Sequence, residues 1–265
     1  MAADTPYAGK DFEVFLQGSY GNATNIWAES DVDIIIRLDG SFTSDLSSLP
    51  QEAKDAYDVA YATATYTESD LKRDVSKVLK NAYGTDVEPG DKALLIAASG
   101  SRRKADVIAA IQYRRYYRFN GLSDESYDEG ICFWNKAGDQ IANFPKQHRE
   151  NCTTKHKNTN LMFKPMVRIF KNMRERMIDD GLIKAGLAPS YYLEGLLYNV
   201  PDDQFANTYV DCFVSAINWL RNADKKEFLC ANEQYYLLRE GHHVTWRTGK
   251  CEAFLEAAVE LWNGW

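Results

Sequence analysis

Two aspartates, Asp31 and Asp33, stand one residue apart at the start of a run of Val and Ile. Side chains alternate across a strand, so both carboxylates are expected to face the same way. Carboxylates this close repel each other, and one would take up a proton unless a cation lay beside them. Divalent Mg²⁺ removes that conflict because hard cations prefer oxygen ligands. The pair therefore indicates a candidate metal site, although most isolated pairs of this kind are solvated turn residues.

Three further features accompany this pair, one of which is Thr24-Asn25, placed between the two halves as if to shape the connecting turn. Gly18 and Ser19 end the preceding apolar run, and such a turn lets a phosphate approach the backbone and bind the serine hydroxyl. Asp106 opens another apolar stretch, ADVIAAI, and adds a third carboxylate if the two strands are neighbours. Two-metal phosphoryl transfer needs such a cluster. A plain tight turn and a hairpin-end aspartate are the structural alternatives.

The string GSYGNATNIWAESDVDIII, residues 18–36, resembles the signature of the polymerase-beta-like nucleotidyltransferase superfamily. In detail it resembles the bacterial cGAS/DncV-like branch, the CD-NTases of anti-phage CBASS operons. That motif reads G-S-Y-x-x-x-T-N-I, a spacer, then S-D-V-D. The matching positions are Gly18, Ser19, Tyr20, Thr24, Asn25, Ile26, Ser30, Asp31, Val32 and Asp33. Two later segments, FKPMVRIFKNMRERM and PSYYLEGLLYNV, resemble the basic helix and the Ser-Tyr helix of the same family.

The resemblance implies a metal-dependent site. Asp31, Asp33 and Asp106 would coordinate two Mg²⁺ ions, with Mn²⁺ as a substitute, and Asp106 would help to activate the acceptor hydroxyl. Gly18 and Ser19 would hold the β- and γ-phosphates of the nucleotide.

The resemblance also assigns roles in the second half of the chain. Lys171 and Ser190 would reach the triphosphate, and Tyr191 would stack on a base. From the residues alone, Lys171 shares a helix face with Lys164 and Arg168, where a cation would offset phosphate charge. A solvated charged face explains the lysines equally well, and Ser190 fits a helix N-cap.

Three functions are compatible with these residues. The first is an enzyme that joins NTPs, with ATP and GTP expected, into a cyclic di- or trinucleotide that activates a downstream effector, with CBASS accessory proteins as further partners. The second is transfer of one NMP to RNA or protein. The third is a catalytically silent nucleotide-binding relative. The three aspartates argue against the third, and the dense motif favours the first over the second.

The elements that must position these residues form an α+β fold. A mixed-sheet nucleotidyltransferase lobe is expected over residues 1–155 and a helical lobe over 156–265, with the active site in the cleft between them. Alternating and apolar runs predict strands at 13–19, 33–38, 92–98 and 105–113, and a hairpin around 136–139. Apolar spacing of three and four predicts helices within 50–80 and at 163–181, 190–199, 203–222, 232–239 and 250–262.

The net charge and the distribution of apolar residues limit which kinds of partner the protein is expected to bind. The 265 residues carry a net charge of −7, which argues against binding of long nucleic acid because that binding depends on phosphate neutralisation. Neither a signal peptide nor an apolar run of membrane-spanning length is recognised, so no membrane partner is expected and the cytoplasm is the expected location.

The cysteines and histidines give a weaker signal. The five cysteines are scattered without C-x-x-C spacing, which favours reduced thiols. His148, Cys152 and His156 stand four apart, as metal ligands on one helix face could. Pro145 and the polar surroundings predict a loop leading into a helix start, so a metal role is disfavoured.

Overall fold

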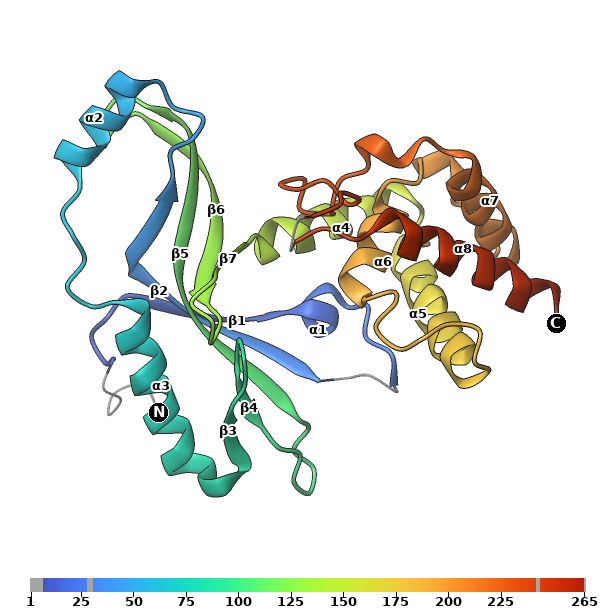
Figure 1. Cartoon of the computed structure of the whole chain (residues 1–265), viewed down its shortest axis with the longest axis horizontal. Helices are drawn as coiled ribbons and strands as arrows, with labels where there is room; N and C mark the ends of the chain where they lie inside the picture. The colour runs from blue at the N-terminus through green and yellow to red at the C-terminus, as the bar shows by residue number, and fades with distance from the viewer. Residues whose placement is uncertain (1–6, 28–30, 242–243, 265) are drawn as a thin grey trace. The chain divides into compact units, whose positions relative to one another are not determined.

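The computed structural model describes residues 7–27, 31–241 and 244–264. The chain divides into two compact units (Figure 1), Met1–Gln17 with Asp31–Pro145 and Gly18–Ser30 with Lys146–Trp265. By its contacts, the segment Gly18–Ser30 therefore belongs to the same unit as the C-terminal helices, although it precedes most strands of the sheet in the sequence. The functional lobes expected at 1–155 and 156–265 stay a prediction, as does a cleft between them. Ser30 of the family motif lies outside the described residues.

The first unit contains a seven-stranded sheet with β1-β2-β5-β4-β3 in order, while β6 pairs with β5 and β7 with β6. Its strands are β1 (Phe12–Gln17), β2 (Val32–Asp45), β3 (Val87–Pro89), β4 (Leu94–Ile96), β5 (Ala105–Phe119), β6 (Glu125–Trp134) and β7 (Gln140–Asn143). Only the β2–β5 pairing among these strands is parallel. The predicted mixed α+β class is therefore confirmed.

Strands β2 and β5 lie in the middle of the sheet because their side chains are apolar on both faces. Ile35, Ile108 and Ala110 are buried in one core cluster with residues of β6. Helix α3 (Glu68–Tyr83) packs on β5 and β2, with Leu71 and Val75 fully buried. These contacts fix the central strands along which the aspartates stand.

Several strands differ in length from the prediction. β1 ends at Gln17 rather than residue 19, because Gly18 takes a positive φ of 61° and starts the short helix α1 (Gly18–Asn22). β2 and β5 each run several residues beyond their apolar cores, into polar stretches that continue the pairing. The hairpins formed by β4 with β5 and by β6 with β7 confirm the predicted turns.

The second unit is helical in its C-terminal part. Its helices beyond α1 are α4 (Pro145–Asn158), α5 (Phe163–Asp179), α6 (Ser190–Tyr198), α7 (Tyr209–Asn222) and α8 (Thr248–Asn263). The fully buried positions of α5 include Met166, Val167, Phe170 and Met177, which is the stripe that the spacing predicts. Helix α2 (Gln51–Ala60) in the first unit completes the predicted helical pair within 50–80.

Two sequence interpretations were wrong in this unit. Helix α4 already begins at Pro145, where a loop was expected, since proline is well tolerated in the first helical turn. Residues 232–239 form turns and bridges instead of a helix. Glu233 has a φ of 59°, and the Asn232 side chain accepts from the Gln234 amide at 3.1 Å, so the backbone leaves the helical path.

The cysteines agree with the prediction of reduced thiols, and the helices that the structure describes agree with the absence of an apolar run of membrane-spanning length in the sequence. All five cysteines are free and buried. Within the described part of the chain, every helix is too short or too polar to cross a membrane.

Candidate functional site

The sheet brings the predicted acidic residues together. Asp33 on β2 is the register partner of Asp106 on the adjacent parallel strand β5. Asp31 comes just before β2, and the Lys104 ammonium, just before β5, lies 2.5 Å from its Oδ2 atom. The condition for a third carboxylate, that the strand of Asp106 neighbours the strand of Asp33, is therefore met.

The electrostatics of this edge are dominated by burial and like charge. Burial raises the pKa of Asp33 to about 6, and the charges of Asp106 and Asp31 add to the rise while Lys104 opposes it. Burial also raises the pKa of Asp106, with Lys104 opposing and Asp31 reinforcing the shift. A carboxylate with a raised pKa is a better proton acceptor than a free one.

The donor set suits a hard cation. Asp106 Oδ1 is buried and has no hydrogen-bond partner, which is costly unless a cation or a donor meets it. Mg²⁺ takes carboxylate oxygens, so the orphaned oxygen and the repelling charges both fit a metal. Among the described residues, three ligand atoms lie within 4.8 Å of one another only at His148, Cys152 and Glu194. The three aspartates are therefore more widely spaced than that group.

Gly18 and Ser19 are the first residues of the short helix α1 in the second unit, and the turn that carries them closes at Thr24. Gly18 and Ala23 have positive φ angles of 61° and 54°, and the Thr24 amide donates to the Ser19 carbonyl at 2.9 Å. A glycine at the first of these positions adopts the left-handed conformation without steric cost. The turn follows β1 directly, and Gln17 at the end of β1 pairs with Asp33.

Lys171 is buried in this structure, and its expected role at the triphosphate stays a prediction. Its side chain is 1% exposed. The ammonium donates to the Thr24 carbonyl at 3.2 Å, to Thr24 Oγ1 at 3.1 Å and to Glu194 Oε1 at 2.8 Å. An ammonium has three donors, so in this conformation all of them are used inside the protein.

Ser190 and Tyr191 open α6. Ser190 follows the N-cap residue Pro189, and its Oγ accepts from Arg174 at 3.1 Å rather than capping the helix. The Tyr191 ring stacks on His148 at 5.2 Å between centroids, and its hydroxyl accepts from Asn232 at 3.1 Å. One face of the tyrosine ring is therefore covered by a side chain of α4.

Residues 150–263 match the family model for the cGAS/DncV-like nucleotidyltransferase C-terminal helical domain. A cyclic UMP-AMP synthase of Rhodothermus marinus is 41% identical over 96% of this chain and 85% of its own length. The chain belongs to the cGAS/DncV-like nucleotidyltransferase (CD-NTase) family. It is thus a nucleotidyltransferase, as the Gly-Ser and Asp-x-Asp motifs predicted.

Other CD-NTases agree with this assignment. The cyclic nucleotide synthase CdnE01 of Staphylococcus haemolyticus is 37% identical over 96% of this chain and 85% of its own length. The solved structure of Rhodothermus marinus CdnE c-UMP-AMP synthase with Apcpp and Upnpp has a TM-score of 0.89 at 39% identity, covering 100% of this chain and 88% of that one. These relatives place the chain in the CdnE clade of the CD-NTases.

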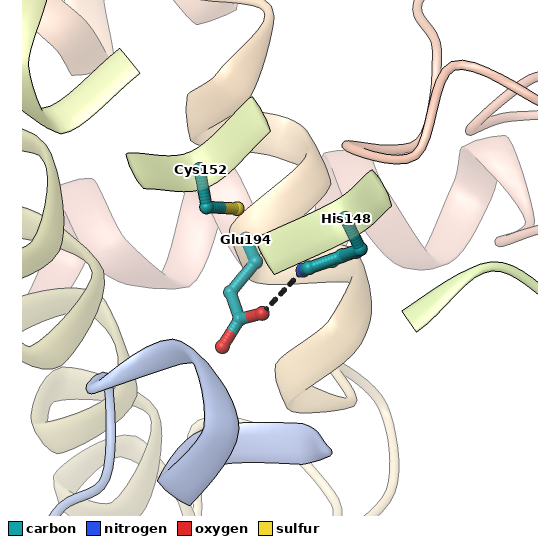
Figure 2. Close-up of side chains that lie close together, drawn as sticks. All are labelled: His148, Cys152 and Glu194. Carbon is teal, nitrogen blue, oxygen red and sulfur yellow. Dashed lines mark hydrogen bonds and ion pairs between the residues drawn. The ribbon is translucent and has the colours of Figure 1, made fainter. Parts of the chain in front are cut away.

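The tightest cluster of metal-type ligands in the described residues is not an open metal site. His148 and Cys152 on α4 and Glu194 on α6 converge (Figure 2), and His148 Nε2 lies 2.7 Å from Glu194 Oε2. The Lys171 ammonium already bonds the other carboxylate oxygen. Burial raises the pKa of the Cys152 thiol well above its usual value, which disfavours the thiolate that a metal requires. The doubt about a His148, Cys152 and His156 metal site is therefore supported by this geometry.

Two residues that the structure places at candidate functional positions were not singled out from the sequence. Gln17 pairs with Asp33 across β1 and β2, so both side chains face the same side, and Gln17 Oε1 is buried without a partner. Its position directly before Gly18 was the available signal. Glu194 lies four residues after Ser190 in an otherwise apolar helix, and a lone carboxylate there was a sign of a buried ion pair.

Proposed function

We propose that this CD-NTase joins nucleoside triphosphates into a cyclic dinucleotide second messenger. The observation that carries the proposal is the pairing of Asp33 with Asp106 on adjacent parallel strands, with Asp31 beside them. That arrangement supplies the three carboxylates of a phosphoryl-transfer site in a chain whose relatives include a cyclic UMP-AMP synthase.

Asp31, Asp33 and Asp106 would hold two Mg²⁺ ions in the working enzyme, and Mn²⁺ could replace them. When bound, such ions activate the attacking ribose hydroxyl and neutralise the charge of the leaving pyrophosphate. Asp106 has a raised pKa and an unpaired oxygen, so it can accept the proton that the attacking hydroxyl gives up. The new bond joins the ribose oxygen to the α-phosphorus, and the bond from that phosphorus to pyrophosphate breaks.

The remaining assigned residues bind the nucleotide. Gly18 and Ser19 offer backbone amides and a hydroxyl to the β- and γ-phosphates, as the left-handed turn allows. Ser190 contributes a hydroxyl from α6, and Tyr191, whose ring stacks on His148, contributes its aromatic ring to a base. Lys171 neutralises charge beneath the turn rather than reaching the phosphates, because its ammonium is already saturated.

The substrates include a purine triphosphate. The 41%-identical relative is a cyclic UMP-AMP synthase and a 38%-identical relative from Elizabethkingia meningoseptica is a cyclic dipurine nucleotide synthase. The product of both contains a purine, so ATP is the substrate that we expect first, with GTP or UTP as its partner.

The biological setting follows from the same family. The cyclic product activates a downstream effector in anti-phage defence, with CBASS accessory proteins as further partners. The enzyme works in the cytoplasm, which suits its five free, buried thiols and its need for NTPs.

The product decides between the candidate functions. Purified protein incubated with Mg²⁺ and all four NTPs is expected to release pyrophosphate and a phosphatase-resistant dinucleotide, identified by mass spectrometry. Label transferred to added RNA or protein instead would overturn the proposal in favour of NMP transfer. Tight NTP binding without any turnover would indicate a silent relative.

Metal affinity is expected to depend on pH. Asp33 titrates with a pKa of about 6, so it is protonated below that pH and ionised above it. A protonated carboxyl does not ligate Mg²⁺, so affinity at pH 5 should be about tenfold weaker than at pH 7.5. Calorimetric titration of the nucleotide-bound protein with Mg²⁺ measures this, and Asp33→Asn should flatten the pH dependence. A pH-independent affinity in the unaltered protein would contradict the metal role of Asp33.

A further inference from the structure

A buried carboxylate on α6 gathers four donors from three separate parts of the second unit. Glu194 is 2% exposed. Its Oε1 accepts from Thr24 Oγ1 at 2.5 Å and from the Lys171 ammonium at 2.8 Å. Its Oε2 accepts from Asn22 Nδ2 at 2.8 Å and lies 2.7 Å from His148 Nε2. We call Asn22, Thr24, His148, Lys171 and Glu194 the Glu194 hub.

The charge at this hub is retained despite burial. Burial alone would raise the pKa of Glu194, but its hydrogen bond from His148 and the charge of Lys171 outweigh it and hold the pKa well below its usual range. An ionised carboxylate without its partners would be very costly in the interior. Removal of Lys171 alone would therefore leave the Glu194 charge buried without its ion-pair partner.

Two of the four donors belong to the turn that carries Gly18 and Ser19. Asn22 ends α1, and Thr24, two residues later, is fully buried. The Thr24 amide bonds back to the Ser19 carbonyl at 2.9 Å. The carboxylate is thus connected to Ser19 through one residue, and in Figure 2 it points toward the blue ribbon of this segment.

We propose that Glu194 is a positioning residue, which through Thr24 and Asn22 holds the Gly18–Ser19 turn in its phosphate-binding conformation while Lys171 balances its charge. The inference rests on the proposed function, in which Gly18 and Ser19 bind phosphates. Glu194 itself touches no substrate in this scheme. A small displacement of a phosphate-binding turn is enough to slow transfer strongly, because reacting groups must be aligned closely.

The rest of the hub supports positioning over ligand binding. All three protons of the Lys171 ammonium are used within the protein, and the Thr24 hydroxyl both donates to Glu194 and accepts from Lys171. His148 Nδ1 is buried without a partner, but the bonds among Thr24, Lys171 and Glu194 satisfy one another and fix the orientation of these side chains. A network of this kind is suited to holding a turn rigidly.

Thr24→Val and Thr24→Ser form the test pair. Valine keeps the shape of threonine and removes the hydroxyl, whereas serine keeps the hydroxyl. In Thr24→Val we expect the Kd of the unreactive analogue Apcpp, titrated with Mg²⁺ by calorimetry, to rise about tenfold at unchanged stoichiometry. Turnover of NTPs should fall about 10- to 100-fold. Thr24→Ser should stay within about threefold of the unaltered protein in both measurements.

Thr208→Ala is the matched control. Thr208 caps α7 in the same unit, its hydroxyl accepts from the Asp211 amide at 3.1 Å, and it makes no contact with the hub. Its loss should lower the melting temperature, as loss of a cap does, without changing the Kd of Apcpp. A purely structural hub predicts the same pattern for Thr24→Val, namely lower stability or stoichiometry with an unchanged Kd, and that result would overturn the inference.

Asp33→Asn separates failure of the inference from failure of the proposed function. If Asp33→Asn is inactive while Thr24→Val binds and turns over normally, only the positioning role falls. If Asp33→Asn retains turnover, the proposed catalytic site itself is wrong. Glu194→Gln is a second test of the hub. The glutamine amide can no longer accept hydrogen bonds from all four donors, so this variant should raise the Kd of Apcpp as Thr24→Val does.

Discussion

Replacing Asp33 with asparagine should abolish synthesis of the cyclic product, by at least about 10³-fold, while making the metal-free protein more heat-stable. The two effects have one origin. Asp33 lies beside Asp106, its charge is opposed by those of Asp106 and Asp31, and Lys104 partly offsets this repulsion. A metal-binding carboxylate is useful to catalysis and unfavourable to the fold whenever the metal is absent.

The direction of the stability change follows from the raised pKa of Asp33. Its pKa is about 6 in the folded protein and 3.8 in its ordinary state, so the folded state binds more protons between these values. Stability is therefore lost as pH rises through that range. An asparagine at this position carries no charge, and Asp33→Asn should be more stable than the unaltered protein at pH 7 by about 1–2 kcal/mol, discounted because Asp33 is partly exposed. The difference should vanish below about pH 4, where the aspartate is protonated in both states.

Thermal unfolding in EDTA and product formation in Mg²⁺ measure the two effects on the same preparations. Asp58→Asn is the control, because Asp58 is an exposed residue of α2 and its replacement also removes one negative charge from the first unit. It should leave both turnover and melting temperature unchanged. An inactive Asp33→Asn that melts lower than the unaltered protein would point to a structural role for Asp33 and against a metal site.

The acidic edge could be predicted from the sequence because local pattern and strand geometry act together there. Asp31 and Asp33 precede an apolar run, Asp106 precedes another, and both runs become central strands because they are apolar on both faces. Once those strands are neighbours, the carboxylates must meet. The family motif then indicates that these carboxylates bind metal ions for phosphoryl transfer.

The sequence could not predict that Lys171 is buried in an ion pair. Its spacing with Lys164 and Arg168 correctly indicates one helix face, but spacing does not tell whether a face meets water or another polar group. The deciding partner, Glu194, is 23 residues away on another helix, and Thr24 is 147 residues away. The helix predicted at 232–239 was wrong for a similar reason, because the buried Asn232 side chain accepts from the backbone amide of Gln234 and this local bond outweighs the apolar spacing.

The burial of Lys171 gives the largest stability effect that we expect. Lys171→Met keeps the length of the side chain but leaves the Glu194 carboxylate without its ammonium. Removing one partner of a buried ion pair costs about 3–5 kcal/mol because the other charge stays in the interior. In a chain of this size the melting temperature should fall by roughly 10 °C.

Arg176→Ala is the comparison for an exposed pair. Arg176 and Asp180 lie 2.7 Å apart on the surface of the same helix, at spacing of four, and such pairs are worth at most about 1 kcal/mol. Its melting temperature should therefore change by only a few degrees. If Lys171→Met costs no more than Arg176→Ala, the Glu194 charge is not held by Lys171 and the hub is weaker than its distances indicate.

A second substitution separates charge from packing. Adding Glu194→Gln to Lys171→Met removes the orphaned charge, so the double variant should regain at least half of the lost melting temperature, since neutralising both partners of a buried pair is much less costly than removing one. The same double variant should still bind Apcpp weakly, because a glutamine side chain in place of Glu194 cannot accept from both Thr24 and Asn22 while facing His148. Stability would then follow the buried charge and nucleotide affinity would follow the hydrogen bonds to the turn, which are distinct properties of one carboxylate.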